Sequence, residues 1–189
     1  YNCMDFTIKN SFLRAFDDVM DIFGAPGFDT WNNENILVEN CVLWSDWGAN
    51  IQVGGCSMAP EYKNLIIRDC DCIHVASDHA IRVFYSDRAI MHDAVFEDIR
   101  IEYSKHDVSN QFQRTDEQEF REIPRLAGII RFDSPDFFAF AEEVRGRVEN
   151  VICRDIQVYT DEGQEMPPVM VRGLSEENCV RRITFENIL

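Results

Sequence analysis

One segment of about eight residues recurs along the chain and constrains its fold more than any other feature. The six copies are residues 6–13 (FTIKNSFL), 36–43 (ILVENCVL), 65–72 (LIIRDCDC), 94–101 (AVFEDIRI), 151–158 (VICRDIQV) and 183–189 (ITFENIL). Each copy has Asn or Asp at one position, namely Asn10, Asn40, Asp69, Asp98, Asp155 and Asn187, and the successive separations are 30, 29, 29, 57 and 32 residues. A period of about 30 residues is typical of a solenoid, in which each unit, here called a coil, stacks on its neighbours.

The residues around each Asn or Asp alternate between apolar and charged. The residue two positions before it is apolar and the residue one position before it is charged, as in Val38 and Glu39. The residue after it is apolar in five of the six copies, so the alternation changes phase there. This change predicts a bend, and a turn residue that recurs once per coil predicts a ladder of stacked Asn and Asp side chains.

A second apolar run follows in each coil and predicts a second strand. The runs are residues 19–24, 50–55, 80–85, 127–132 and 168–173. Two or more short strands per coil, with little helical periodicity, indicate an all-β fold, namely a single-stranded parallel β-helix. Leucine-rich repeats are the alternative, but they lack the second strand, and Leu is not the repeated residue here.

The chain of 189 residues has the length of one domain. We expect residues 1–189 to be one β-helix domain, taken from a longer β-helix whose remaining coils would be its partners. Residues 102–127 interrupt the repeat with a highly charged loop insertion. Long loops in solenoids commonly lie on the binding face, so this loop forms either the wall of a binding groove or a plain surface loop.

Composition excludes several classes of partner. The chain has 34 acidic and 18 basic residues, a net charge of −16, which argues against binding to nucleic acid or to an acidic membrane surface. The sequence has no apolar run long enough to span a membrane. It also has no standard metal-binding spacing of Cys or His, so we expect no metal and no cofactor. Of the seven cysteines, Cys41, Cys70 and Cys153 fall at inward positions, where free buried thiols are favoured over a bridge between Cys41 and Cys70.

Polar residues that precede the second strand in three consecutive coils form the candidate site. They are Asp17, Asp18, Asp46, Trp47, Asp78 and His79, with Arg82 at an outward position of the strand after His79. Stacked strands lie about 4.8 Å apart, so these side chains should gather on one face. Neighbouring carboxylates shift each other's pKa values apart, which lets one act as an acid and another as a base. The competing interpretation is that these aspartates are turn residues of an acidic protein.

Each other candidate has a structural alternative as well. Trp47 offers an aromatic surface to a sugar, or packs against the neighbouring coil. His79 orients a ligand, or is a hydrogen-bonded structural histidine. Arg82 binds substrate, or neutralises the aspartates.

Three of these segments together resemble the active-site coils of glycoside hydrolase family 28, the polygalacturonase-like enzymes. They are Asp17-Asp18 before VMDIFG, Trp47-Gly48-Ala49-Asn50-Ile51 one coil later, and Ala80-Ile81-Arg82-Val83-Phe84 in the next. The stretch VLWSDWGANIQVGG also resembles family 49, the dextranases and isopullulanases. The resemblance covers about residues 5 to 102 by motif. It implies a right-handed parallel β-helix, a secreted or periplasmic protein and hydrolysis with inversion by three aspartates.

Carried over residue by residue, the resemblance makes Asp17 the general acid and Asp18 one of the two residues that activate water. The third aspartate should lie one coil earlier, which is absent from this sequence. The substrate-binding residues would be Asp46, Trp47, Asp78, His79 and Arg82.

Two departures from the family pattern bear on the substrate. The His-Gly of polygalacturonases is Trp47-Gly48 here, and their Arg-Ile-Lys is Arg82-Val83-Phe84. Loss of the Lys, together with the acidic chain, favours a neutral polysaccharide or oligosaccharide over polygalacturonate.

Two other functions fit the same repeat. One is a non-catalytic glycan-binding or structural β-helix, such as an adhesin or a tailspike-like segment. The other is a polysaccharide lyase that uses Arg82 and calcium.

Overall fold

A computed structural model describes residues 2–27, 30–75, 79–103, 111–112, 121–122, 128–135, 139–140, 145–163 and 165–189. These residues form β-strands and turns without a helix, which confirms the predicted all-β class. In chain order the strands are β1 (Met4–Lys9), β2 (Phe12–Ala15), β3 (Met20–Gly24), β4 (Asn33–Glu39), β5 (Val42–Ser45), β6 (Ile51–Ser57), β7 (Glu61–Val75), β8 (His79–Phe84), β9 (Ile90–Tyr103), β10 (Gln111–Phe112), β11 (Arg121–Glu122), β12 (Gly128–Asp133), β13 (Arg147–Thr160), β14 (Met170–Val171) and β15 (Val180–Ile188).

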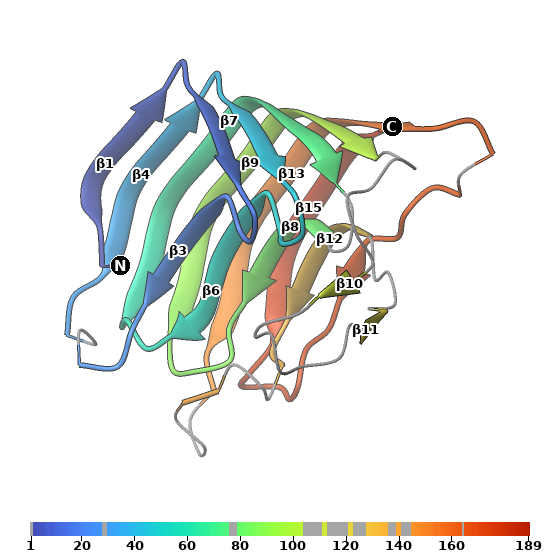
Figure 1. Cartoon of the computed structure of the whole chain (residues 1–189). Helices are drawn as coiled ribbons and strands as arrows, with labels where there is room; N and C mark the ends of the chain where they lie inside the picture. Colours follow the sequence, from blue (N-terminus) through green and yellow to red (C-terminus); the bar gives the residue numbers. More distant parts are fainter. Residues whose placement is uncertain are drawn as a thin grey trace.

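The strands form two main sheets, and all pairs within these sheets are parallel (Figure 1). The larger sheet has the order β1-β4-β7-β9-β13-β15, with β2 and β5 pairing alongside. The smaller sheet has the order β3-β6-β8-β12-β14. Neighbouring strands pair residues about one coil apart, such as Ile36 with Leu65 and Val53 with Val83. Both predicted strand runs of each coil are therefore present, and their arrangement is compatible with a parallel β-helix.

Bends at the repeated Asn and Asp divide the strands of the larger sheet, as predicted. Asn10, Asn40, Asp69, Asp98, Asp155 and Asn187 all have a positive φ, between 50° and 54°. Asn and Asp tolerate this left-handed conformation better than other side chains. The amide of Asn40 donates to Oδ1 of Asn10 at 2.7 Å, and the amide of Asn187 donates to Oδ1 of Asp155 at 2.8 Å. These hydrogen bonds confirm the predicted ladder.

A second ladder lies five residues before the first and was not predicted. Its members are Asp5, Asn35, Asn64, Asp93, Asn150 and Arg182, all with positive φ. Asn35 donates to Asp5 at 2.8 Å, and Asn64 donates to Asn35 at 3.0 Å. The strands of the larger sheet therefore bend at two positions in each coil.

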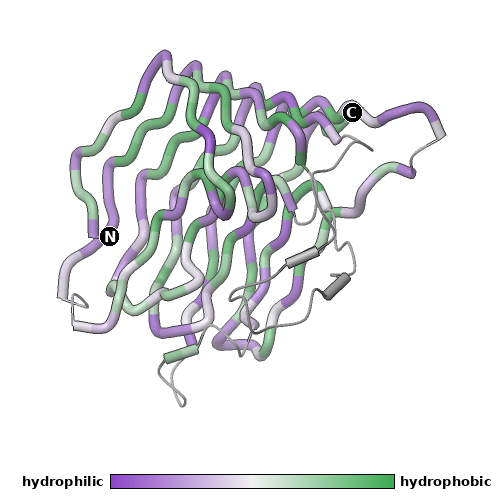
Figure 2. The backbone as a smooth tube through the Cα atoms, viewed as in Figure 1, coloured by the Kyte–Doolittle hydropathy of each residue, from purple (hydrophilic) through white to green (hydrophobic). Residues whose placement is uncertain are grey.

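The core fills the space between the two sheets, and apolar and polar residues alternate along the strands that enclose it (Figure 2). Val38, Ile67, Phe96 and Cys153, which share one position of the repeat, are all buried. The cysteines of the chain are free thiols, as favoured from their inward positions.

The predicted insertion begins two residues later than expected, because β9 continues to Tyr103. At the other side of the insertion, β12 begins at Gly128. Between them, β10 and β11 form an antiparallel pair, and the rest of the insertion lies outside the described residues.

Candidate active site

Asp17 and Asp18 lie in the turn between β2 and β3, and the turn of the next coil holds them in place. Ser45 Oγ donates to the backbone oxygen of Asp17 at 3.1 Å. The backbone N–H of Ala49 donates to Oδ1 of Asp18 at 2.7 Å, and the N–H of Val19 donates to the oxygen of Ala49 at 3.0 Å. The two turns are therefore joined on both sides of the Asp-Asp pair.

Gly48 makes this close approach of the two turns possible. A Cβ atom at this position would lie 2.5 Å from Oδ1 of Asp17 and 2.5 Å from both the backbone nitrogen and Oδ1 of Asp18. Real Cβ atoms do not come so close to other atoms, so the turn would have to move. Gly48 was noticed in the sequence only as part of a motif, without a role.

Arg82 reaches back across one coil to the aspartates. It extends outward from β8, between the core residues Ile81 and Val83, as predicted. Its Nη2 donates to Oδ1 of Asp18 at 2.5 Å, and only 8% of Arg82 is exposed. One carboxylate oxygen of Asp18 thus accepts hydrogen bonds from a guanidinium and from a backbone N–H, which together fix its position.

Asp21 is a third carboxyl group in this region, and sequence reasoning missed it. It is on β3 at the outward position after the Asp-Asp pair, beside Gln52 of β6. Gln52 Nε2 donates to Oδ1 of Asp21 at 3.1 Å. Burial of the carboxyl raises the pKa of Asp21 to about 7; Gln52 and Arg82 oppose this rise, and the charges of Asp18 and Asp17 add to it. Part of the Asp21 residue is exposed to solvent, so burial is not the only cause of the raised pKa. Repulsion by the carboxylates of Asp18 and Asp17 raises it as well.

Two further predicted binding residues, Asp46 and Trp47, follow β5. Both oxygens of Asp46 accept hydrogen bonds from Arg14, whose Nη2 lies 3.0 Å from Oδ1 and whose Nε lies 3.2 Å from Oδ2. Trp47 is half-buried, and its ring lies parallel to that of Phe16, with ring centroids 6.4 Å apart. Phe16 is 56% exposed and directly precedes Asp17, so an aromatic surface borders the aspartates.

The last two predicted binding residues are Asp78 and His79. Asp78 lies outside the described residues. His79 begins β8 and is 2% exposed, with its imidazole against Gly128, where a Cβ atom would not fit. In this position His79 is packed between two coils, and its role in binding remains a prediction.

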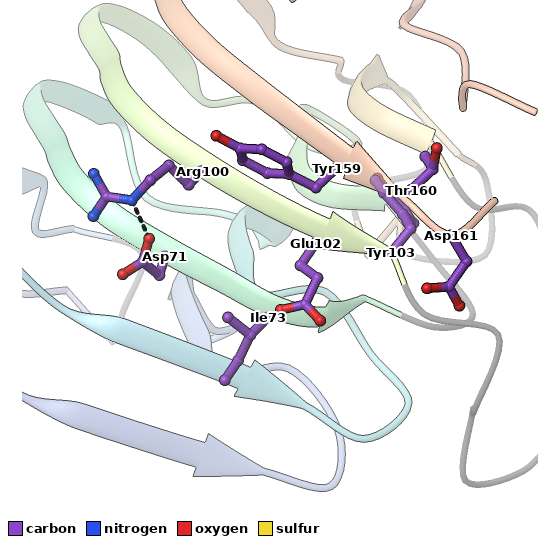
Figure 3. A pocket seen from close by; sticks show the side chains of 8 residues that line it. All are labelled: Asp71, Ile73, Arg100, Glu102, Tyr103, Tyr159, Thr160 and Asp161. Carbon is purple, nitrogen blue, oxygen red and sulfur yellow. Dashed lines mark hydrogen bonds and ion pairs between the residues drawn. The ribbon is translucent and has the colours of Figure 1, made fainter. Parts of the chain in front are cut away.

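A hollow of about 520 Å³ lies on the larger sheet and contains none of the predicted site residues (Figure 3). Its lining comes from β7, β9 and β13 and includes an ion pair between Arg100 and Asp71, together with Glu102 and Tyr159. Tyr159 is 53% exposed. Asp71, Glu102 and Asp161 share this hollow with one guanidinium, that of Arg100. We place the candidate site at the aspartates near Arg82 instead, because side chains from three successive coils meet there, with Arg82 bound to Asp18 and Ala49 N–H bound to the same carboxylate.

No protein-family model, curated protein or solved structure matches this chain significantly. Within the described ranges, no helix has the length and apolar character needed to cross a membrane. The same residues contain no cluster of three or more His, Cys, Asp or Glu side chains suited to a metal ion.

Proposed function

We propose that the chain is a right-handed parallel β-helix that hydrolyses a glycosidic bond of a neutral polysaccharide or oligosaccharide with inversion. The proposal includes a secreted or periplasmic location and the further coils of a longer β-helix as partners of this segment. It depends on the resemblance of three successive coils to glycoside hydrolase families 28 and 49.

The observation that carries the proposal is the pairing of Asp18 with Arg82. Arg82 and the N–H of Ala49 hold Oδ1 of Asp18, and Asp17 lies beside it on the same turn. An inverting glycosidase needs one carboxyl group that donates a proton and one carboxylate that activates water. A carboxylate fixed by a cation beside a second carboxyl group is suited to this division of roles.

In the proposed reaction, Asp17 donates its proton to the glycosidic oxygen as the bond from that oxygen to the anomeric carbon breaks. A water molecule attacks the anomeric carbon from the opposite face and gives its proton to Asp18. The products are a free alcohol and a sugar of inverted configuration, and solvent restores both carboxyl groups. Phe16 and Trp47 provide an apolar surface for a sugar ring next to Asp17.

A neutral substrate follows from the charges around the site. Among the residues that the structure describes, Asp17, Asp18 and Asp21 lie near one guanidinium, that of Arg82. Phe84 stands where the family pattern has a Lys, and it packs under Arg82 with 5.4 Å between the guanidinium carbon and the ring centroid. A uronate carboxylate needs a cation as its partner, and Asp18 already engages the guanidinium of Arg82, whereas hydroxyl groups need no cation.

The test is the substitution of each catalytic aspartate in the full-length protein, assayed on a panel of neutral polysaccharides with polygalacturonate for comparison. We expect Asp17→Asn and Asp18→Asn each to lower kcat by about 10²- to 10⁴-fold, the usual contribution of an acid or base. Glu97→Gln is the matched control, because Glu97 pairs with Arg154 on the outside of the larger sheet. The anomeric form of the first product should be inverted.

Three outcomes would contradict the proposal. Full turnover by Asp17→Asn would remove the proposed acid. Binding of glycans without product would favour the non-catalytic β-helix. An unsaturated product that absorbs ultraviolet light, lost on chelation of calcium, would indicate a lyase.

A further inference from the structure

Three outward side chains form a row across neighbouring strands of the smaller sheet. Asp21 of β3 pairs in register with Gln52 of β6, which pairs with Arg82 of β8. Neighbours in such a row are about 4.8 Å apart, a spacing comparable to the width of one sugar ring. The row begins next to the turn that holds Asp17 and Asp18, so a ring bound there would be adjacent to the proposed catalytic groups.

Gln52 carries an unused hydrogen-bonding group within this row. The residue is 3% exposed, and its Nε2 donates to Asp21, while its buried Oε1 has no hydrogen-bond partner. A buried amide oxygen without a donor is unfavourable, because it has lost its hydrogen bonds to water. Two donors could satisfy it, namely a hydroxyl group of a ligand or a proton carried by Asp21.

We propose that Asp21 and Gln52 form a subsite that binds hydroxyl groups of one uncharged sugar ring. The proposal rests on the proposed function and deepens it, because it names the residues that select a neutral substrate. A carboxyl and an amide side by side offer both donors and acceptors, as a sugar hydroxyl requires. Arg82, the third member of the row, is engaged by Asp18.

The subsite acts with Asp21 in its neutral, protonated form. The charged and titratable groups that face Asp21 are Asp17 and Asp18 from the turn before β3, Arg82 from β8, Cys56 from β6 and Tyr62 from β7. Burial and the two aspartates raise the pKa of Asp21 to about 7, so the carboxyl is protonated in acidic solution and becomes charged as the pH rises through this value. The protonated carboxyl can donate to Gln52 Oε1 or to a sugar hydroxyl, whereas the carboxylate can only accept.

The first test separates binding from catalysis in the full-length protein. We expect the wild-type KM for a neutral oligosaccharide to rise about tenfold between pH 5.5 and pH 8.5, the effect of one lost hydrogen bond of about 1.4 kcal/mol. In Asp21→Asn the side chain stays neutral and can still hydrogen-bond, so KM should remain low and no longer depend on pH. In Asp21→Leu, KM should be high at every pH between 5.5 and 8.5. Glu97→Gln should behave as the wild type.

A second measurement does not depend on turnover. Asp21 should titrate near neutral pH by carbon-13 carboxyl NMR, and the wild-type protein should bind a non-hydrolysable thio-linked oligosaccharide more weakly above that pH in calorimetry. Titration of Asp21 at the ordinary Asp value of about 3.9 would overturn the subsite, whether or not the protein is an enzyme. So would loss of kcat without a change of KM in Asp21→Asn, which would make Asp21 catalytic. Absence of turnover in the wild type would instead count against the proposed function.

Discussion

Gly48 is the residue on which the position of both proposed catalytic aspartates depends. A methyl group there would meet the backbone of Asp18 and the carboxyl oxygens of both aspartates. Because a backbone atom is among them, rotation of a side chain cannot relieve the clash. Gly48→Ala should therefore displace the turn, and a displacement of about 1 Å is enough to cost about 10²-fold in activity.

This prediction is checked by kcat/KM together with the thermal midpoint. Gly173→Ala is the matched control, because a Cβ atom at that position would come no closer than 3.5 Å, an ordinary contact distance, to the backbone of Cys179. We expect normal activity in the control and about a 10²-fold loss in Gly48→Ala. Equal activity in the two variants would show that the turns do not need this close approach.

The sequence allowed part of the site to be predicted at this scale. The repeat predicted an outward Arg82 near the row of aspartates, and the structure joins it directly to Asp18, which lies two coils earlier. Asp21 was noticed only as part of an apolar run, although its position between the inward Met20 and Ile22 indicates an outward carboxyl. Its hydrogen bond to Gln52 depends on the register of β3 against β6, and the period of the repeat alone does not fix that register to a single residue.

At the scale of elements, the bends of the larger sheet were predicted once per coil but occur twice. The second ladder could have been found, because five of the six copies have Asn or Asp five residues before the first ladder.

A row of alternating charge was also present in the sequence: Lys9, Glu39, Arg68, Glu97, Arg154 and Glu186. Ion pairs join Lys9 to Glu39 at 3.2 Å and Glu97 to Arg154 in the structure. These exposed pairs fix the register more than they add stability.

Asn40 allows the two contributions of a ladder residue to be measured separately. Its φ is 53°, and its amide donates to Asn10. Asn40→Ala should lower the free energy of unfolding by about 2–3 kcal/mol, since it loses the hydrogen bond to Asn10 and also the short polar side chain that lets Asn adopt the left-handed conformation. Asn40→Gly should cost only about 1 kcal/mol, because glycine adopts a positive φ without strain.

Urea unfolding of the two variants checks this prediction. The order of stability should be wild type, then Asn40→Gly, then Asn40→Ala. Equal losses in the two variants would mean that the bend carries no strain, and that the ladder contributes only its hydrogen bonds.

At the scale of the whole molecule, the period of about 30 residues predicted an all-β chain with two strand runs per coil, and the structure pairs these strands in parallel between coils. The separation of 57 residues between Asp98 and Asp155 indicated the insertion, and β12 resumes the smaller sheet at its predicted end. The path of the insertion was not predictable, because its charged residues follow no strand or helix period. The charge of −16 is distributed unevenly, with several carboxylates paired across the coils and others gathered near Arg82.

The two ends of the stack present edge strands to solvent, and this determines how the 189-residue chain should behave in solution. Within the described residues, β1 pairs only with β4, and β15 pairs only with β13. Near β1 and β2 the large apolar residues Met4, Phe6 and Phe12 are exposed, and a cavity of about 230 Å³ opens among Phe6, Ile8 and Leu13. Exposed parallel edges with apolar side chains pair readily with other copies.

We therefore expect the 189-residue chain to associate end to end, and to do so more strongly in high salt, which screens the repulsion between chains of charge −16. Sedimentation velocity over a range of concentrations measures this directly. Phe6→Glu places a charge in the open edge and should shift the species toward the monomer. Ile66→Glu is the matched control, because Ile66 is exposed within the larger sheet and away from its edges. In 1 M salt the Debye length is about 3 Å, so repulsion between chains is screened. A monomer at every concentration under these conditions would show that the edge strands do not pair with other copies.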